Sequence, residues 1–275
     1  MNCITIPDIF TIICNEADTT HMLNLTLIST YHKTIIKNDT FINKQIFVND
    51  TEILEHILDN YNFMNLELEY NIDVNKYIDK LKLCHTLIIR EANITNNNIK
   101  KLKGCHTLDL IGIQNLTDET LKKLRFCHTL ILCANKITNK GVKYLKNCHK
   151  LDLSFCNVTD KIVKKLYKCH TLELSCTNIT DKGVRYLNKC HTLNLASTKV
   201  TDKSVKKLTK CHTLNLCNTL ITDESAKKLI KCHIVLLYGT DVTDNVINKS
   251  KNYNVSDLSL QPEILSISLW KNFKI

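Results

Sequence analysis

The apolar positions of the chain recur with a short and regular period. In residues 190–210 (CHTLNLASTKVTDKSVKKLTK) they are Cys190, Leu193, Leu195, Val200, Val205 and Leu208. Leu193 and Leu195 have the spacing of a strand with one buried face, whereas Val205 and Leu208 have the spacing of one helix face. One repeat therefore predicts a strand, a turn, a short helix and a return to the next strand.

A threonine followed by an acidic or amide residue separates each predicted strand from its helix. Thr201 is a suitable N-cap, because its hydroxyl can accept a backbone N–H at the helix start. Asp202 then lies in the first turn, near the positive end of the helix dipole. The same pair occurs in eight repeats, whose threonines are Thr95, Thr117, Thr138, Thr159, Thr180, Thr201, Thr222 and Thr243.

The dipeptide Cys-His marks eight repeats and defines the period. Its cysteines are Cys84, Cys105, Cys127, Cys148, Cys169, Cys190, Cys211 and Cys232, spaced by 21 residues except for one interval of 22. The strand spacing also occurs before them, at Leu66 and Leu68, and after them, at Leu258 and Leu260. This period predicts a solenoid in which each coil packs on its neighbours, with about ten coils over residues 63–275.

The pattern Cys-x-x-Leu-x-Leu-x-x-(Asn/Thr/Cys)-x-(Ile/Val)-Thr-Asp resembles a leucine-rich repeat, specifically a short relative of the cysteine-containing type. The resemblance implies an α/β solenoid of horseshoe shape, with a parallel sheet on the concave side and short helices on the convex side. The position usually held by Asn is Asn135 in one coil and Cys156, Thr177, Thr198, Thr219 and Thr240 in others. Because Thr and Cys can still donate a hydrogen bond to the turn backbone, we expect this ladder of bonds to persist in weaker form.

Composition limits the size, the membrane association and the cellular compartment that we expect for the protein. The 275 residues suffice for one sizeable core and a small module, and they contain no apolar stretch that predicts a membrane span or a signal peptide. Eight of the 14 cysteines have the inward position of a strand start, where a free thiol acts as a small hydrophobe. With several Asn-x-Thr sites at tight turns, this favours a reducing compartment, so we expect a cytoplasmic protein, with a nuclear location as the alternative.

The net charge of +10 has its source in the predicted helices, which carry pairs such as Lys164/Lys165 and Lys206/Lys207. A basic stripe can be a nucleic-acid footprint, but no interleaved aromatic residues support base stacking. We therefore interpret the lysines as a solubilising convex surface. Nucleic acid is not the expected partner.

Residues 1–45 do not follow the repeat. Apolar residues at three- and four-residue spacings in 6–13 and 22–33 predict two short amphipathic helices. The pattern Ile/Leu-Pro … Asp-x-x-x-Leu-Leu-Asn-Leu-x-Leu-Ile/Val-Ser-x-Tyr resembles an F-box, the small all-α module that docks on Skp1 and so on a cullin-RING ubiquitin ligase. Carried over by position, the Skp1-contacting residues are Ile6, Pro7, Ile9, Phe10, Leu23, Leu27 and Ile28.

The alternative for this segment is a plain helical cap over the first coil. Residues 46–62 then form a linker or capping helix before the solenoid of residues 63–275. The pairing of an F-box with such repeats, in a chain rich in Asn, Ile and Lys, resembles the F-box proteins of giant DNA viruses that infect amoebae. A viral origin would place the protein in the host cytoplasm, with a host Skp1-like adaptor.

Side chains between and after the strand leucines are expected on the concave face, where sequence varies while the framework is constant. The candidate target-binding residues are Arg90, Asp109, Ile131, Asp152, Phe155, Glu173, Asn194, Asn215 and Tyr238. This inner surface is mildly acidic at Asp109, Asp152 and Glu173, which predicts an unknown protein ligand with a basic patch.

Repeated Cys and His also suggest zinc, but adjacent strand residues point to opposite faces and a linear row of thiols is not a tetrahedral site. Eight equivalent pairs likewise indicate a framework rather than one activated nucleophile. We therefore expect no metal, no cofactor and no catalytic residue. The predicted function is a target-recognition subunit of a Skp1-cullin-F-box ligase, and the alternative is a leucine-rich-repeat scaffold without a ligase.

Overall fold

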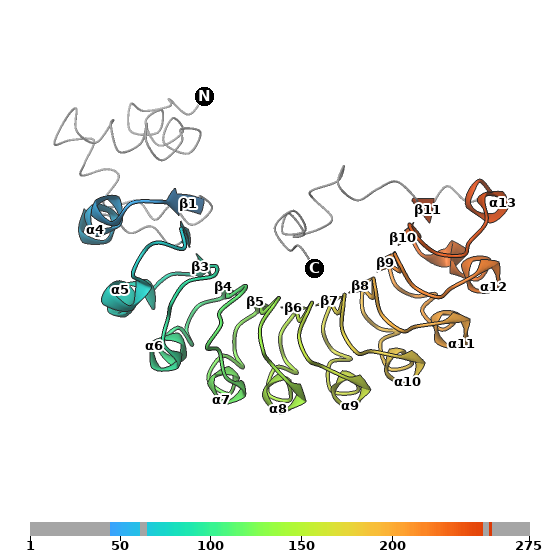
Figure 1. Cartoon of the computed structure of the whole chain (residues 1–275), viewed down its shortest axis with the longest axis horizontal. Helices are drawn as coiled ribbons and strands as arrows, with labels where there is room; N and C mark the ends of the chain where they lie inside the picture. The colour runs from blue at the N-terminus through green and yellow to red at the C-terminus, as the bar shows by residue number, and fades with distance from the viewer. Residues whose placement is uncertain (1–44, 61–64, 250–252, 255–275) are drawn as a thin grey trace, which may run out of the picture. The chain divides into compact units, whose positions relative to one another are not determined.

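The computed structural model describes residues 45–60, 65–249 and 253–254, and it divides into two compact units between Asn157 and Val158. In each unit strands alternate with short helices, and the strands line one side while the helices line the other (Figure 1). The predicted Skp1-contacting residues and the F-box-like module lie outside the described residues.

The described part of the first unit contains six parallel strands in chain order, each paired with the next. The strands are β1 Gln45–Val48, β2 Asn65–Leu68, β3 Thr86–Ile89, β4 Thr107–Asp109, β5 Thr129–Ile131 and β6 Lys150–Asp152. The helices are α4 Thr51–Asn60, α5 Val74–Leu81, α6 Asn96–Lys101, α7 Asp118–Leu121 and α8 Asn139–Val142.

Among its described residues, the second unit repeats this arrangement with five parallel strands, again in chain order. The strands are β7 Thr171–Glu173, β8 Thr192–Asn194, β9 Thr213–Asn215, β10 Ile234–Leu236 and β11 Tyr253–Asn254. The helices are α9 Asp160–Val163, α10 Asp181–Val184, α11 Asp202–Val205, α12 Asp223–Ala226, the 3-10 helix η1 Leu229–Lys231, and α13 Asp244–Ile247.

Strand register confirms the predicted repeat. Thr86 is opposite Thr107, and Thr192 is opposite both Thr171 and Thr213, so equivalent residues of successive coils are neighbours. The apolar residues predicted for residues 190–210 are all buried, with Leu193, Leu195, Val205 and Leu208 fully inaccessible. The core of each unit is therefore the layer between the strand leucines and the inner helix face.

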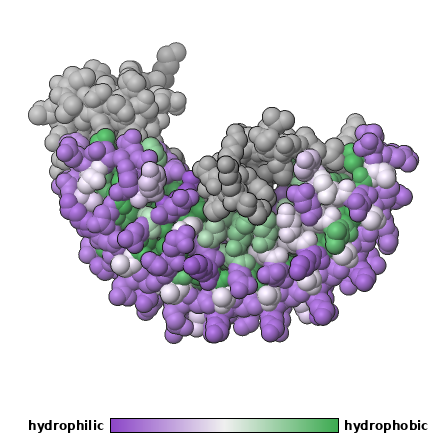
Figure 2. Space-filling view, in the orientation of Figure 1, coloured by the Kyte–Doolittle hydropathy of each residue, from purple (hydrophilic) through white to green (hydrophobic). Residues whose placement is uncertain are grey.

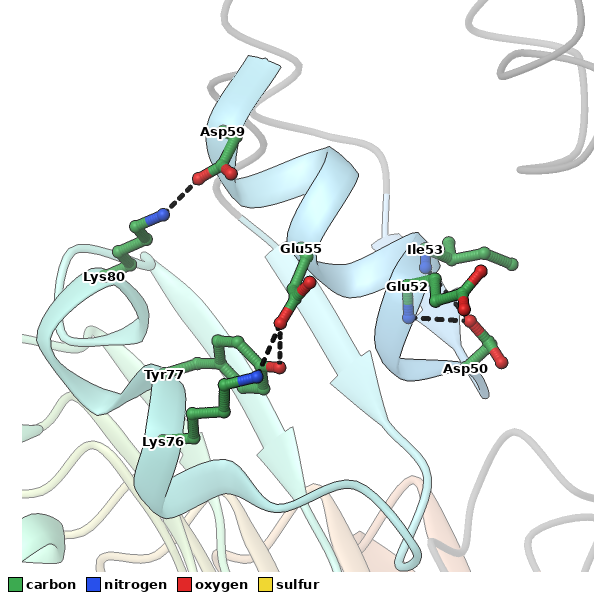
Figure 3. Close-up of polar contacts among 8 residues, drawn as sticks. All are labelled: Asp50, Glu52, Ile53, Glu55, Asp59, Lys76, Tyr77 and Lys80. Atoms are coloured by element: carbon green, nitrogen blue, oxygen red, sulfur yellow. Dashed lines mark hydrogen bonds and ion pairs between the residues drawn. The ribbon is translucent and has the colours of Figure 1, made fainter.

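The sheet begins earlier than the sequence analysis predicted. Residues 46–62, predicted as a linker or capping helix, contain α4, and β1 pairs with β2 and so adds a strand before residue 63. Asp50 caps α4 by accepting the backbone N–H groups of Glu52 and Ile53 at 2.7 and 3.1 Å. Figure 3 shows α4 held to α5 by ion pairs of Glu55 with Lys76 and of Asp59 with Lys80.

The predicted threonines are the N-cap residues of α6 to α13. The acidic residue that follows has a further partner besides the helix dipole. Asp181 accepts the backbone N–H of Thr201 at 2.8 Å and its hydroxyl at 2.7 Å, from the next coil. We call this pair of bonds the Asp-Thr clamp; it recurs as Asp118–Thr138, Asp160–Thr180, Asp202–Thr222 and Asp223–Thr243.

The ladder at the Asn position persists with a changed geometry. Asn135 donates to the carbonyl of Leu110 in the preceding coil at 2.8 Å and to that of Leu132 at 2.9 Å. Thr198 and its equivalents Thr177, Thr219 and Thr240 donate to the carbonyl three residues earlier, within their own coil. Cys156, at the same position, donates to the carbonyl of Leu132 in the preceding coil at 3.1 Å. In the second unit, the Asp-Thr clamp supplies side-chain bonds between successive coils.

Candidate functional site on the strand side of the two units

The predicted target-binding residues fall into two groups with different exposure. Asp109, Asp152, Asn194 and Asn215 are buried, and each side chain folds back to accept the backbone N–H two residues later at 2.8 to 3.1 Å. Burial raises the pKa of Asp109 and of Asp152 above that of an exposed carboxyl. The expectation of an acidic surface at Asp109 and Asp152 is therefore wrong, because these short side chains close the strand ends.

Arg90 forms ion pairs with residues of two neighbouring strands in the first unit. Its guanidinium lies 3.1 Å from the carboxylate of Glu67 and 2.8 Å from that of Asp109, on the two neighbouring strands. Arg90 opposes the effect of burial on the pKa of Asp109, and burial remains the larger effect. The Arg90 side chain stays 40% exposed, so it can still contact a partner while its position is held by two carboxylates.

Phe155 and Tyr238 are the exposed aromatic residues of the predicted set, at 44% and 47%, whereas Ile131 and Glu173 are partly exposed. Phe155 belongs to a row that follows the strands and has a left-handed backbone. The non-glycine members of this row are Glu91, Ala134, Phe155, Cys176, Ser197 and Asn218, with φ between 53° and 59°. Their backbone is fixed by bonds to the next coil, such as Ala134 N–H to Ser154 O at 3.0 Å.

The structure brings together a set of residues that the sequence analysis did not consider as a surface. The histidines of the Cys-His pairs stack face to face, with ring centroids 4.4 to 4.5 Å apart. We call these rows the histidine ladders; they contain His85, His106, His128 and His149 in the first unit and His170, His191, His212 and His233 in the second. The 21-residue recurrence of Cys-His was the signal that could have predicted them.

Each histidine lies beside the threonine or other residue that starts the strand. In the second unit, Nδ1 of His191 is 3.3 Å from Oγ1 of Thr192, and Nδ1 of His212 is 3.2 Å from Oγ1 of Thr213. Burial and the neighbouring rings together lower the pKa of His106 and of His212, because stacked imidazoles resist simultaneous protonation. The histidines of both ladders are exposed, except for His85, which is partly buried.

The cysteines lie on the opposite side of the chain from the histidines, as predicted. The thiols of Cys84, Cys105, Cys169, Cys190 and Cys211 are buried, and burial raises the pKa of each to about 12. Such thiols are protonated and shielded, which fits packing rather than nucleophilic attack. In the described parts of the chain, no three His, Cys, Asp or Glu side chains are placed to share a metal ion.

The positive charge of the chain is concentrated in the second unit. Residues 1–157 contain 18 basic and 17 acidic residues, whereas residues 158–275 contain 19 basic and 10 acidic residues. Figure 2 shows that hydrophilic residues dominate the helix-bearing side of this unit. The C-cap residue of each helix from α9 to α12 is basic and exposed. These residues are Lys164, Arg185, Lys206 and Lys227. Among the described helices, none is long and apolar enough to cross a bilayer.

A family model of the leucine-rich repeat matches residues 149–166 and 170–187. The fold is a leucine-rich-repeat solenoid. An internalin of Listeria monocytogenes is similar with 16% identity and a TM-score of 0.50, over 78% of this chain and 74% of its own. A leucine-rich-repeat protein of Leptospira interrogans is similar with 18% identity and a TM-score of 0.51, over 81% and 62% of the two chains.

A chain of the mouse RP105/MD-1 complex is similar with 13% identity and a TM-score of 0.50, and the match covers 72% of this chain and 43% of that one. At these identities the likeness concerns the fold alone. A search of curated proteins finds no match. The leucine-rich-repeat fold is one that commonly serves as a scaffold for protein–protein interaction.

Proposed function

We propose that this chain is a protein-recognition module that holds a partner on the strand side and carries out no chemistry of its own. The observation that carries the proposal is the contrast between the framework and the surface. Asp109, Asp152 and the thiols of the Cys-His pairs are buried, and the aspartates of the Asp-Thr clamp are bonded to the next coil. By contrast, Arg90 and Phe155 in the first unit and Tyr238 in the second present charged and aromatic side chains to solvent. Arginine and aromatic residues are the types that most often dominate the energetics of protein interfaces.

The known complex among the similar structures supports a protein partner for this fold. Replacing Phe155 or Tyr238 with alanine is expected to weaken capture of this chain's own protein partner, because each substitution removes a large exposed side chain. Leu220, which is 65% exposed but is not part of the strand rows, is the matched control. If the Phe155→Ala and Leu220→Ala variants captured the partner equally well, a binding role for Phe155 would be contradicted.

The finer proposal assigns residues 1–45 to a Skp1-like adaptor, which makes the chain a target-recognition subunit of a cullin-type ubiquitin ligase. Its support is the F-box resemblance of the sequence around Pro7 and Leu23–Ile28. In this role the chain raises the concentration of the target near the ligase without new chemistry. The buried thiols favour a reducing location, which for this proposal is the cytoplasm or the nucleus.

Affinity capture from eukaryotic cells tests the ligase link. The tagged full chain is expected to retain a Skp1-like adaptor together with the target, and a chain that lacks residues 1–45 is expected to lose the adaptor and keep the target. Replacement of Ile9 and Leu27 by Asp should mimic the deletion, whereas replacement of Thr19 and Thr20 by Ala should not. Retention of the target without any adaptor by the full chain would favour the alternative, a scaffold that works without a ligase.

A further inference from the structure

In the second unit, the three residues that precede strands β7 to β10 follow one pattern, which the strands of the first unit lack. Each of β7 to β10 is preceded by Lys-Cys-His, with the lysines at Lys168, Lys189, Lys210 and Lys231. The equivalent positions in the first unit are Leu83, Gly104, Phe126 and Asn147. A row of four cations therefore accompanies one histidine ladder and not the other.

Geometry places the lysines and histidines on the same side. The cysteine between them is buried, and the backbone of Cys232 is extended at φ −71° and ψ 144°. In an extended backbone the residues on either side of a buried one point away from it. Accordingly, all four lysines and His170, His191, His212 and His233 are exposed. We call this double row the Lys-His edge.

The Lys-His edge has little acidic compensation. Glu173 is the acidic residue within the described strands β7 to β10, and it lies three residues after His170. The acidic residues that start the helices of this unit, such as Asp181 and Asp202, are already bonded to threonines in the Asp-Thr clamp. The charged groups that flank the ladder are therefore the four lysines before it and Glu173 after it.

The stacking of the imidazoles favours carboxylates over single-stranded nucleic acid as the anionic ligand of the Lys-His edge. The rings of His170, His191 and His212 stack face to face at 4.4 to 4.5 Å, and the ring of His233 is tilted by 32° against that of His212. Between the stacked rings, the ring edges rather than the faces remain for a ligand. Proteins that bind single-stranded nucleic acid without sequence preference offer free aromatic faces to the bases. A carboxylate needs no such face, because it accepts hydrogen bonds from an imidazole N–H and from an ammonium group.

We propose that the Lys-His edge of the second unit binds an acidic, extended segment of a protein partner. This inference rests on the proposed function and names the chemistry of the partner. A row of ammonium groups repeated once per coil matches a chain with repeated carboxylates, and the imidazoles add charge when they are protonated. Protonation is expected to make binding stronger at pH 6 than at pH 8, and because burial and the neighbouring rings lower the pKa of His212, this residue contributes less to that gain than an ordinary histidine would.

Fluorescence anisotropy with the full chain and a labelled 12-residue peptide of alternating Glu and Ser tests the proposal. Replacing Lys168, Lys189, Lys210 and Lys231 by Ser is expected to weaken binding about tenfold. The matched control replaces Lys164, Arg185, Lys206 and Lys227 by Ser on the helix side, which changes the net charge equally and is expected to weaken binding less than threefold. Replacing His191 and His212 by Asn is expected to reduce the strengthening between pH 8 and pH 6.

Three results would overturn the proposal: absence of peptide binding, equal weakening by the two sets of four substitutions, or tighter binding of a 20-nucleotide oligo(dT) than of the peptide. The last result would instead assign the edge to nucleic acid. Failure here is distinguishable from failure of the proposed function. If the target is still captured through Phe155 or Tyr238 while the peptide does not bind, the recognition role stands and the Lys-His edge is not part of it.

Discussion

Replacing Asp181 with alanine removes three hydrogen bonds that join two successive coils. The carboxylate accepts the backbone N–H of Thr201 at 2.8 Å, its hydroxyl at 2.7 Å and the hydroxyl of Ser204 at 2.6 Å. A hydrogen bond to a charged group contributes about 1.5–3 kcal/mol when it is buried, and roughly 1 kcal/mol is a suitable value for this partly buried site. We therefore expect Asp181→Ala to lower the free energy of unfolding by about 3 kcal/mol.

Urea unfolding followed by circular dichroism measures this loss, and amide hydrogen exchange at Thr201 measures its local part. Asp181→Asn keeps one acceptor oxygen and should lose less, and Thr201→Val, which removes one clamp bond and the N-cap, should cost about 1–2 kcal/mol. The exposed carboxylate Asp241 is the control, whose replacement by alanine should change stability by less than about 0.5 kcal/mol.

A double-mutant cycle between Asp181→Ala and Thr201→Val separates the clamp from general effects of the two substitutions. The combined variant should lose less than the sum of the single losses, because both remove the same bond. If Asp181→Ala destabilised the protein no more than Asp241→Ala, or if the two losses were additive, the clamp would not contribute as we have argued.

Three further outcomes follow from the same structure. Ala134→Gly is expected to stabilise by about 0.5–1 kcal/mol in thermal unfolding, since φ is 58° there, whereas Ala92→Gly at an ordinary φ should destabilise. Iodoacetamide at pH 8 should modify the half-buried Cys176 well before Cys190, whose pKa burial raises to about 12, and equal rates by peptide mass spectrometry would contradict this. The backbone hydrogen bond from Thr243 is the main cause that lowers the pKa of Asp223. Stability from this carboxylate is therefore complete above the unfolded pKa near 3.9 and lost as pH falls through the lower folded pKa, so Asp223→Asn should flatten the acid limb of the unfolding profile.

The sequence was sufficient to predict the coils because their framework depends on local spacing. Leu193 and Leu195 are two residues apart and Val205 and Leu208 three apart, and each pair is buried as a strand or helix face requires. The N-cap role of Thr201 follows in the same way, from a hydroxyl placed next to a helix start. These features need no knowledge of the neighbouring coil.

The side chains of the candidate site were predicted less well, since their partners lie one coil away. Asp152 stands in the position of an exposed strand residue, yet it is buried and bonded to the backbone of Ser154. The composition of one repeat does not reveal whether a carboxylate faces solvent or closes a turn. Arg90 was predicted as a contact residue, but its ion pairs with Glu67 and Asp109 depend on register across three strands.

By itself, the sequence determined the period, the order of strand and helix, and the inward position of the cysteines, because each of these follows from which residues recur every 21 positions. Only the tertiary structure decided that the histidines form ladders and that Asp181 clamps Thr201. The physical reason is that both depend on the distance and direction between equivalent residues of adjacent coils. That relation is set by how the coils stack, which no single repeat contains.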